Sequence, residues 1–186
     1  MKILLLSDSH LYNDILEHVL KNNHADMIIH CGDSIFQEDD PLLKTIITVR
    51  GNHDLDHLPI RKTLFIEKHK CLVTHGHCDN IYAGYETLYR RMKADNYDIC
   101  FHGHTHVPYL TYYKEKLFIN PGSIMFNRGN TNCGSYAIVY IDQNNIQVKF
   151  YDSQTLEELP MSLIKENEAI LNEFKELVKS IKNRKN

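Results

Sequence analysis

The sequence predicts an α/β fold, and three observations lead to this prediction. Residues 2–6 form a nearly continuous apolar run, which is typical of a strand in a sheet that helices cover on both faces. An amphipathic helix and a second apolar strand follow, and a strand–helix–strand unit favours a parallel pair with a right-handed crossover. Strand patterns then recur along the chain, with one further helix among them and another at the C-terminal end.

The composition narrows the class of protein. A length of 186 residues suits one domain, which we expect to span residues 1–186. A net charge of −3 does not indicate a nucleic acid as partner. Five cysteines without a Cys-x-x-Cys pair predict reduced thiols, and no apolar run approaches the ~20 residues of a membrane span. We therefore expect a cytoplasmic protein without a membrane partner, and its 12 histidines point to metal or acid–base chemistry.

Apolar runs and turns place the elements of the first half. A helix over residues 14–22 has its buried stripe at Ile15, Leu16, Val19 and Leu20. Strands are expected at residues 2–6, 27–31 and 46–49, and a strand pair around a turn at residues 64–66 and 70–74.

The second half reads in the same way. Apolar residues at helical spacing predict a helix over residues 82–96, and residues 98–101 form the next strand. Hairpins are expected over residues 109–119 and 135–151. A final amphipathic helix runs from residue 161 to about 182. Its apolar face, expected to pack on the core, consists of Ile170, Leu171, Phe174, Leu177, Val178 and Ile181.

Five of these strands run directly into loops that are rich in Gly, Asp, His and Asn. Ligands of open α/β folds bind beyond the strand ends, so we expect these loops to share one site. The mixture of carboxylate, imidazole and amide groups suits divalent ions such as Mn²⁺, Fe²⁺ or Zn²⁺. Two ions about 3.5–4 Å apart, sharing one carboxylate, would use this many groups. The loops offer Asp8 and His10; Asp33; Asn52 and His53; His75 and His77; and His102, His104 and His106.

Together these loops resemble the motifs of the metallophosphoesterase (calcineurin-like phosphoesterase) superfamily, and the short chain resembles its small YfcE-like phosphodiesterases. The resemblance implies a four-layer αββα sandwich with a dinuclear site at the strand ends. The motifs are Asp8-x-His10, Gly32-Asp33, Gly51-Asn52-His53-Asp54, His75-Gly76-His77 and Gly103-His104-x-His106, with Asn120-Pro121-Gly122-Ser123 after the last of them.

The resemblance also implies a role for each residue. Two divalent metal ions are expected, with Mn²⁺ as first choice and Fe, Zn, Ni or Co as alternatives. Asp8, His10, Asp33 and His106 would hold the first ion, and Asp33, Asn52, His75 and His104 the second. The catalytic pair would be His53, as general acid or as a phosphate donor only, and Asp54, which could orient it. Substrate contacts would come from Asn52, His53, His77 and Arg128, although a surface role for Arg128 is a close alternative.

The expected function is hydrolysis of a phosphodiester by water activated between two ions. The alternatives are a phosphomonoesterase or protein phosphatase, and a non-catalytic protein-binding scaffold of the same fold. The expected partner is a small phosphoester substrate, and a homo-oligomer is a further possibility.

Where the family often has a proline before the arginine, this chain has Asn127, so the loop of Arg128 is expected to be less rigid.

Overall fold

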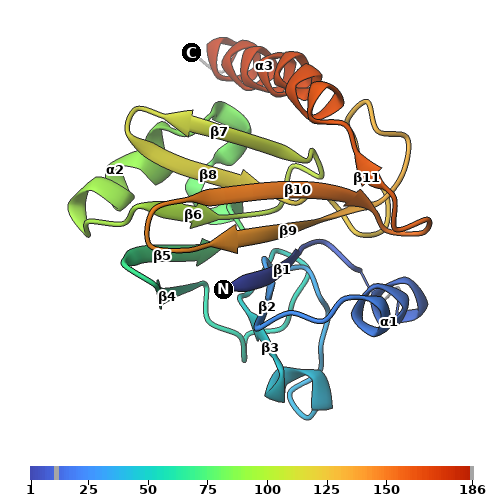
Figure 1. The fold of residues 1–186 in the computed structure, drawn as a ribbon. Helices are drawn as coiled ribbons and strands as arrows, with labels where there is room; N and C mark the ends of the chain where they lie inside the picture. Colours follow the sequence, from blue (N-terminus) through green and yellow to red (C-terminus); the bar gives the residue numbers. More distant parts are fainter. Residues whose placement is uncertain (11–12, 185–186) are drawn as a thin grey trace.

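The computed structural model describes residues 1–10 and 13–184, and two β-sheets form its centre (Figure 1). The first sheet has the spatial order β11-β10-β9-β1-β2-β3, and the second has the order β4-β5-β6-β8-β7. The strands of the first sheet are β1 (Lys2–Leu6), β2 (Met27–His30), β3 (Ile46–Thr48), β9 (Ser135–Ile141), β10 (Ile146–Asp152) and β11 (Glu158–Leu159). Those of the second sheet are β4 (Arg61–Ile66), β5 (His69–Thr74), β6 (Ile99–Phe101), β7 (Tyr109–Tyr113) and β8 (Lys116–Asn120).

Both sheets contain a parallel set of strands. In the first sheet, β1 pairs with β2 and β2 with β3 in parallel, while β9 lies antiparallel to β1. In the second, β5, β6 and β8 are parallel, and the edge strands β4 and β7 are antiparallel to their neighbours. The predicted strands and the parallel β1–β2 pair are therefore confirmed, although β4 begins three residues before its predicted start and β11 was not predicted.

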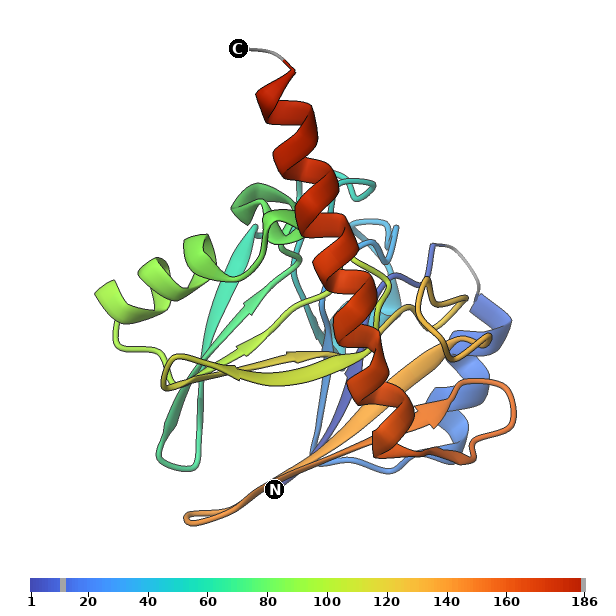
Figure 2. The same ribbon diagram turned by 90° about the horizontal axis from the view of Figure 1, so that it is seen from above.

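Three apolar clusters separate four layers, and β1 shows why. Ile3 and Leu5 point into a cluster between the two sheets, whereas Leu4 and Leu6 point to the helix α1 (Asn13–Asn22). A third cluster fills the space between the second sheet and α2 (Glu86–Ala94). Helices α1 and α2 lie at opposite sides of the molecule in Figure 2. This arrangement confirms the αββα sandwich.

The helix α2 is shorter than predicted. The expectation of a helix from residue 82 is wrong, because Gly84 has φ +98° and ψ −170°, which no α-helix accommodates. Tyr82 lies instead in a short 3₁₀ helix, η3 (Ile81–Ala83). Two other short helices are η1 (Pro41–Lys44) and η2 (His77–Asp79).

The last helix, α3 (Met161–Asn183), has the predicted length but not the predicted burial. It crosses above the rest of the chain, and its C-terminal end projects beyond the strands (Figure 2). Ile164 and Asn167 are buried, but Leu177 is 58% exposed and Ile181 46% exposed. The expected core packing is thus wrong for the last turns of α3, because the helix extends beyond the strands on which it packs. No helix among the described residues is long and apolar enough to cross a membrane.

Candidate metal centre

The five polar loops meet where the carboxyl ends of the two parallel sets of strands lie together. Backbone hydrogen bonds join the loops within each sheet. Asp8 N donates to the Gly32 carbonyl at 3.0 Å, and Gly103 N donates to the His75 carbonyl at 3.1 Å. Across the sheets, His104 N donates to Asp8 Oδ2 at 3.1 Å. The fold therefore brings loops from distant parts of the sequence to one place.

The first expected ligand group converges on the Asp8 carboxylate. His106 Nε2 lies 3.1 Å from Asp8 Oδ1, and the Nε2 atoms of His10 and His106 are 3.3 Å apart. Ligand atoms that bind one ion at about 2.1 Å lie roughly 3.0–3.4 Å from each other. The facing imidazole nitrogens of His10 and His106 are thus spaced as ligands of a common ion.

The second expected group converges on His75. His75 Nδ1 donates to the Cys31 carbonyl at 2.8 Å, which leaves Nε2 free to face the site. That Nε2 lies 3.3 Å from Asp33 Oδ2 and 3.1 Å from Asn52 Oδ1. The His104 ring lies next to it, with ring centroids 4.9 Å apart. All four expected residues of this group therefore lie together.

A buried carboxylate oxygen tests whether a cation fits here. Asp8 is fully buried, and its Oδ1 has no hydrogen-bond partner among the described residues. Burial by itself would raise the pKa of Asp8, but the neighbouring His75 and His106 hold that pKa well below its usual range. Leaving such an oxygen unsatisfied is costly, and a divalent cation held by Asp8, His10 and His106 would satisfy it. The residues present fit a metal ion.

Burial and the two carboxylates set the charge on the histidines. Burial lowers the pKa of His75, but Asp8 and Asp33 outweigh this effect and raise the pKa to about 8. Burial lowers the pKa of His104 to about 4. In the absence of a cation, a proton on His75 compensates part of the negative charge, and a metal ion has to displace that proton.

Two glycines allow the carboxylates to approach. A Cβ on Gly51 would overlap Asp33, and a Cβ on Gly103 would overlap Ser7 and come within 2.7 Å of Asp8 Oδ2. Any larger residue at these two positions would push the aspartates out of place.

The rim of the site carries the expected substrate residues. Asn52, His53 and Arg128 are exposed, and a ring nitrogen of His53 lies within 4.8 Å of ligand atoms of His10 and Asp33. Arg128 N donates to the His106 carbonyl at 2.8 Å, which places its loop beside the first ligand group. His77 is partly buried, with its ring centroid 5.4 Å from that of His75.

The orienting role expected for Asp54 is not supported by its hydrogen bonds. Asp54 Oδ2 accepts from the backbone N of Asp33 and of Gly51, both at 2.7 Å, and Oδ1 accepts from Ile35 N at 2.6 Å. The carboxylate therefore holds the Asp33 loop rather than the His53 ring. His53 is linked to Asp33 through its own backbone N, which donates to Asp33 Oδ1 at 2.8 Å.

The residue before Arg128 makes several hydrogen bonds through its side chain. Asn127 is buried, and its Oδ1 accepts from Ser123 N at 2.8 Å. Its Nδ2 donates to Thr131 Oγ1 and to Ser135 Oγ, both at 2.9 Å. The Asn127 side chain thus makes hydrogen bonds within this loop, and the lower rigidity expected for it stays a prediction.

Polar residues behind the site support the last histidine loop. Asn120 Nδ2 donates to the Gly103 carbonyl at 3.0 Å, and Ser123 Oγ donates to the Asp8 carbonyl at 2.9 Å. His102 is buried behind the site, beside the ring of Tyr85. Sequence reasoning missed Tyr82, whose hydroxyl donates to the His104 carbonyl at 3.0 Å. The sequence signal that could have revealed this is Gly84, which disfavours a helix across it and would have moved the predicted helix start to a residue after Tyr82.

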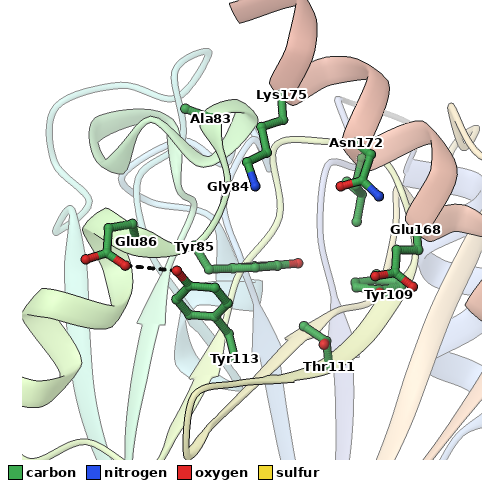
Figure 3. Close-up of a pocket in the computed structure, with 11 residues that line it drawn as sticks. Ala83, Gly84, Tyr85, Glu86, Tyr109, Thr111, Tyr113, Glu168, Asn172 and Lys175 are labelled. Atoms are coloured by element: carbon green, nitrogen blue, oxygen red, sulfur yellow. Dashed lines mark hydrogen bonds between the residues drawn. The ribbon is translucent and has the colours of Figure 1, made fainter. Parts of the chain in front are cut away.

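A separate pocket of about 380 Å³ lies between α3 and β7 (Figure 3). Glu168, Asn172 and Lys175 project into it from α3, opposite the rings of Tyr85 and Tyr113. None of its lining residues is an expected metal ligand, so this pocket is distinct from the metal centre.

Comparison with known proteins assigns the family. The sequence model described as the calcineurin-like phosphoesterase superfamily domain matches residues 1–144. The chain belongs to this superfamily. As a calcineurin-like phosphoesterase it is a hydrolase of phosphoesters, and the clustered carboxylates and imidazoles are its candidate metal ligands.

Three relatives of this phosphoesterase are informative. It is 35% identical over 155 residues to the probable metallophosphoesterase YsnB of Bacillus subtilis, which covers 82% of this chain and 91% of that protein. A crystal structure from Streptococcus pneumoniae, of a conserved protein described as a predicted phosphoesterase, has a TM-score of 0.79 at 34% identity and covers 86% of this chain and 92% of that one. The phosphodiesterase YfcE of Escherichia coli is 30% identical over 120 residues, or 60% of each chain.

Proposed function

We propose that this phosphoesterase is a phosphodiesterase that acts on a small substrate in the cytoplasm. It would use two divalent metal ions, with Mn²⁺ as the first choice of metal. One observation carries the dinuclear part. Asp33 Oδ2 lies 3.3 Å from His75 Nε2 and 3.9 Å from His10 Nε2, so that one carboxylate oxygen faces a ligand of each expected ion. Asp8 Oδ1 is placed similarly, 3.1 Å from His106 Nε2 and 3.8 Å from His75 Nε2.

The chain's own residues would bind and orient the substrate. When bound, two divalent ions supply an activated water and positive charge for the phosphoryl oxygens. The exposed guanidinium of Arg128 can donate two parallel hydrogen bonds to a phosphoryl group. The exposed imidazole of His53 can donate a proton from a ring nitrogen to the leaving oxygen. Asn52, which is neutral, contributes an oxygen without adding a negative charge that would repel the phosphate.

The preference for diesters is supported by the relative from Escherichia coli that is named a phosphodiesterase. Phosphomonoesters and phosphoproteins are the alternative substrates. The scaffold alternative is disfavoured because all seven expected ligand residues keep metal-binding side chains, of which a protein-binding surface has no need.

The test is the substitution Asp33→Asn in protein that has been stripped with a chelator and reloaded with Mn²⁺. We expect wild-type protein to bind two ions per chain and to hydrolyse bis(p-nitrophenyl) phosphate faster than p-nitrophenyl phosphate. Asp33→Asn should lower the bound metal towards one ion or none and abolish turnover, because it removes the charge that both ions share. Metal content by mass spectrometry and initial rates give both answers.

Asp39→Asn is the matched control, since Asp39 is exposed and the chemical change is the same. An Asp33→Asn protein that keeps two ions and a normal rate would refute the dinuclear assignment. A faster rate with the monoester would favour the phosphomonoesterase alternative, and metal binding without turnover of either ester would favour the scaffold.

A further inference from the structure

Helix α3 lies beyond the matched segment of residues 1–144, yet it contacts the loops that form the rim of the metal centre. Asn167 of α3 is fully buried and makes two of these contacts. Its Nδ2 donates to the Pro108 carbonyl at 3.0 Å, and its Oδ1 accepts from Asn130 N at 2.9 Å. Pro108 is two residues after the expected ligand His106, and Asn130 is two residues after Arg128. One side chain of α3 thus joins both segments.

A second line of contacts starts one heptad further along α3, at Phe174. The Phe174 ring packs edge-on against Tyr82, with centroids 5.2 Å apart, and Tyr82 packs edge-on against the expected ligand His104 at 5.0 Å. The Tyr82 hydroxyl donates to the His104 carbonyl at 3.0 Å and accepts a hydrogen bond from Arg128 Nη1. Tyr82 therefore connects the helix, a metal-ligand loop and the rim arginine.

We propose that Tyr82 is a positioning residue, which holds the Arg128 guanidinium at the rim of the site for the phosphoryl group, and that α3 keeps Tyr82 in place through Phe174. This inference rests on the proposed phosphoesterase site. It adds to that site a tyrosine from a 3₁₀ turn and a helix outside the family's matched segment.

The physical reason is the freedom of an exposed arginine. Arg128 is exposed, and fixing a free arginine side chain upon binding costs rotamer entropy. A hydrogen bond from its Nη1 to a half-buried, ring-packed hydroxyl fixes part of the side chain before substrate arrives. Preorganisation of this kind strengthens binding by lowering the ordering cost. Tyr82 should therefore affect how tightly the phosphoryl group binds more than how fast the bound ester reacts.

The first experiment is Tyr82→Phe, which removes the hydroxyl and keeps the ring contacts with Phe174 and His104. With Mn²⁺-loaded protein and bis(p-nitrophenyl) phosphate, we expect KM to rise about 3- to 10-fold and kcat to stay within about 2-fold. The number of bound Mn²⁺ ions should not change. Tyr112→Phe is the matched control, because Tyr112 is 69% exposed on the edge strand β7. A fall in kcat with unchanged KM would overturn the proposal.

A double-mutant cycle tests whether Tyr82 acts through Arg128. We expect Arg128→Ala to raise KM, and Tyr82→Phe to have little further effect in the Arg128→Ala background. Additive effects of the two substitutions would show that Tyr82 acts elsewhere and would overturn the proposal. Phe174→Leu should shift KM in the same direction as Tyr82→Phe, whereas Leu177→Ala, at an exposed position of the same helix, should not.

Binding of inorganic phosphate separates this inference from the proposed function. Calorimetry on the Mn²⁺-loaded protein should give a phosphate Kd that Tyr82→Phe and Arg128→Ala weaken to a similar extent. If wild-type protein hydrolyses no ester but shows this pattern, the proposed function fails and the positioning role stands. If phosphate does not bind, or binds equally well to the wild type and to Tyr82→Phe, the positioning role fails.

Discussion

The backbone at five of the seven expected metal ligands has a positive φ angle. These residues are Asp8 at 54°, His10 at 46°, Asp33 at 55°, His104 at 70° and His106 at 57°. Positive φ is uncommon for residues other than glycine and costs on the order of 1 kcal/mol each. The strain persists because hydrogen bonds such as His10 N to the Asp33 carbonyl, at 3.0 Å, hold the loops. Ligand direction at this site is therefore set by the backbone as well as by side-chain rotamers.

At the same scale, His53→Ala separates acid catalysis from phosphate binding. A general acid matters most for a poor leaving group, so the rate with a nucleoside or alkyl diester should fall by about 10²–10⁴. The rate with a nitrophenyl diester should change little, because that leaving group departs without a proton. Rates of both substrates with Mn²⁺-loaded protein provide the measurement.

The control for His53→Ala is His24→Ala, at an exposed position after α1. An equal loss with both leaving groups would assign His53 to phosphate binding. A loss of bound metal would make His53 a ligand, which its distance to His10 and Asp33 allows.

At the scale of elements, short loops rather than long helices carry the site, and ion pairs fix those loops to the framework. Asp79 of η2 is buried and follows the His75 loop directly. Arg61 Nη2 of β4 donates to both of its carboxylate oxygens at 2.8 Å, and Arg91 Nε of α2 donates to Oδ1 at 3.3 Å. One carboxylate thus joins β4, η2 and α2 beside the expected ligand His75.

We therefore expect Asp79→Asn to lower the free energy of unfolding by roughly 2–3 kcal/mol. Breaking a fully buried pair costs about 3–5 kcal/mol, and the partial exposure of both arginines reduces the effect. Urea unfolding of metal-free protein is the measurement, with the exposed Asp95→Asn as control. A change below about 0.5 kcal/mol, which is usual for surface substitutions, would contradict this role for the ion pairs.

At the scale of the whole molecule, the metal centre joins the two sheets. Asp8, His10, Asp33 and Asn52 follow strands of the first sheet, whereas His75, His104 and His106 follow strands of the second. Without a cation, a proton on His75 compensates only part of the charge of the Asp8 and Asp33 carboxylates, and Asp8 Oδ1 has no hydrogen-bond partner among the described residues. Metal binding should therefore stabilise the packing of one sheet on the other.

The expected result is a higher melting temperature with Mn²⁺. A ligand at 100 times its Kd adds about 2.7 kcal/mol, and for a chain of this size that corresponds to a rise in Tm of roughly 5–10 °C. Scanning calorimetry of chelator-treated protein, with and without Mn²⁺, measures the shift. Asp33→Asn should reduce the shift, whereas Asp39→Asn should leave it intact. An unchanged Tm at saturating Mn²⁺ would mean that the loops do not bind the ion.

The sequence by itself determined most of the strands, most of the helices and the types of ligand side chain at the strand ends. These features are local: apolar runs and helical spacing define elements, and Asp, His and Asn show their ligand chemistry wherever they lie. The predicted strand β1 was confirmed at its residue bounds, and the family motifs gave the αββα layers.

The tertiary structure alone decided how distant segments meet, because contacts between residues 20 to 100 positions apart leave no local pattern. In the folded chain, Asp54 accepts hydrogen bonds from the backbone of the Asp33 loop and not from the His53 ring. The fold also places Tyr82 between α3 and His104. The tertiary structure also determines the exposure of Leu177 and Ile181, because the apolar face of a helix is buried only where other elements of the protein pack against it.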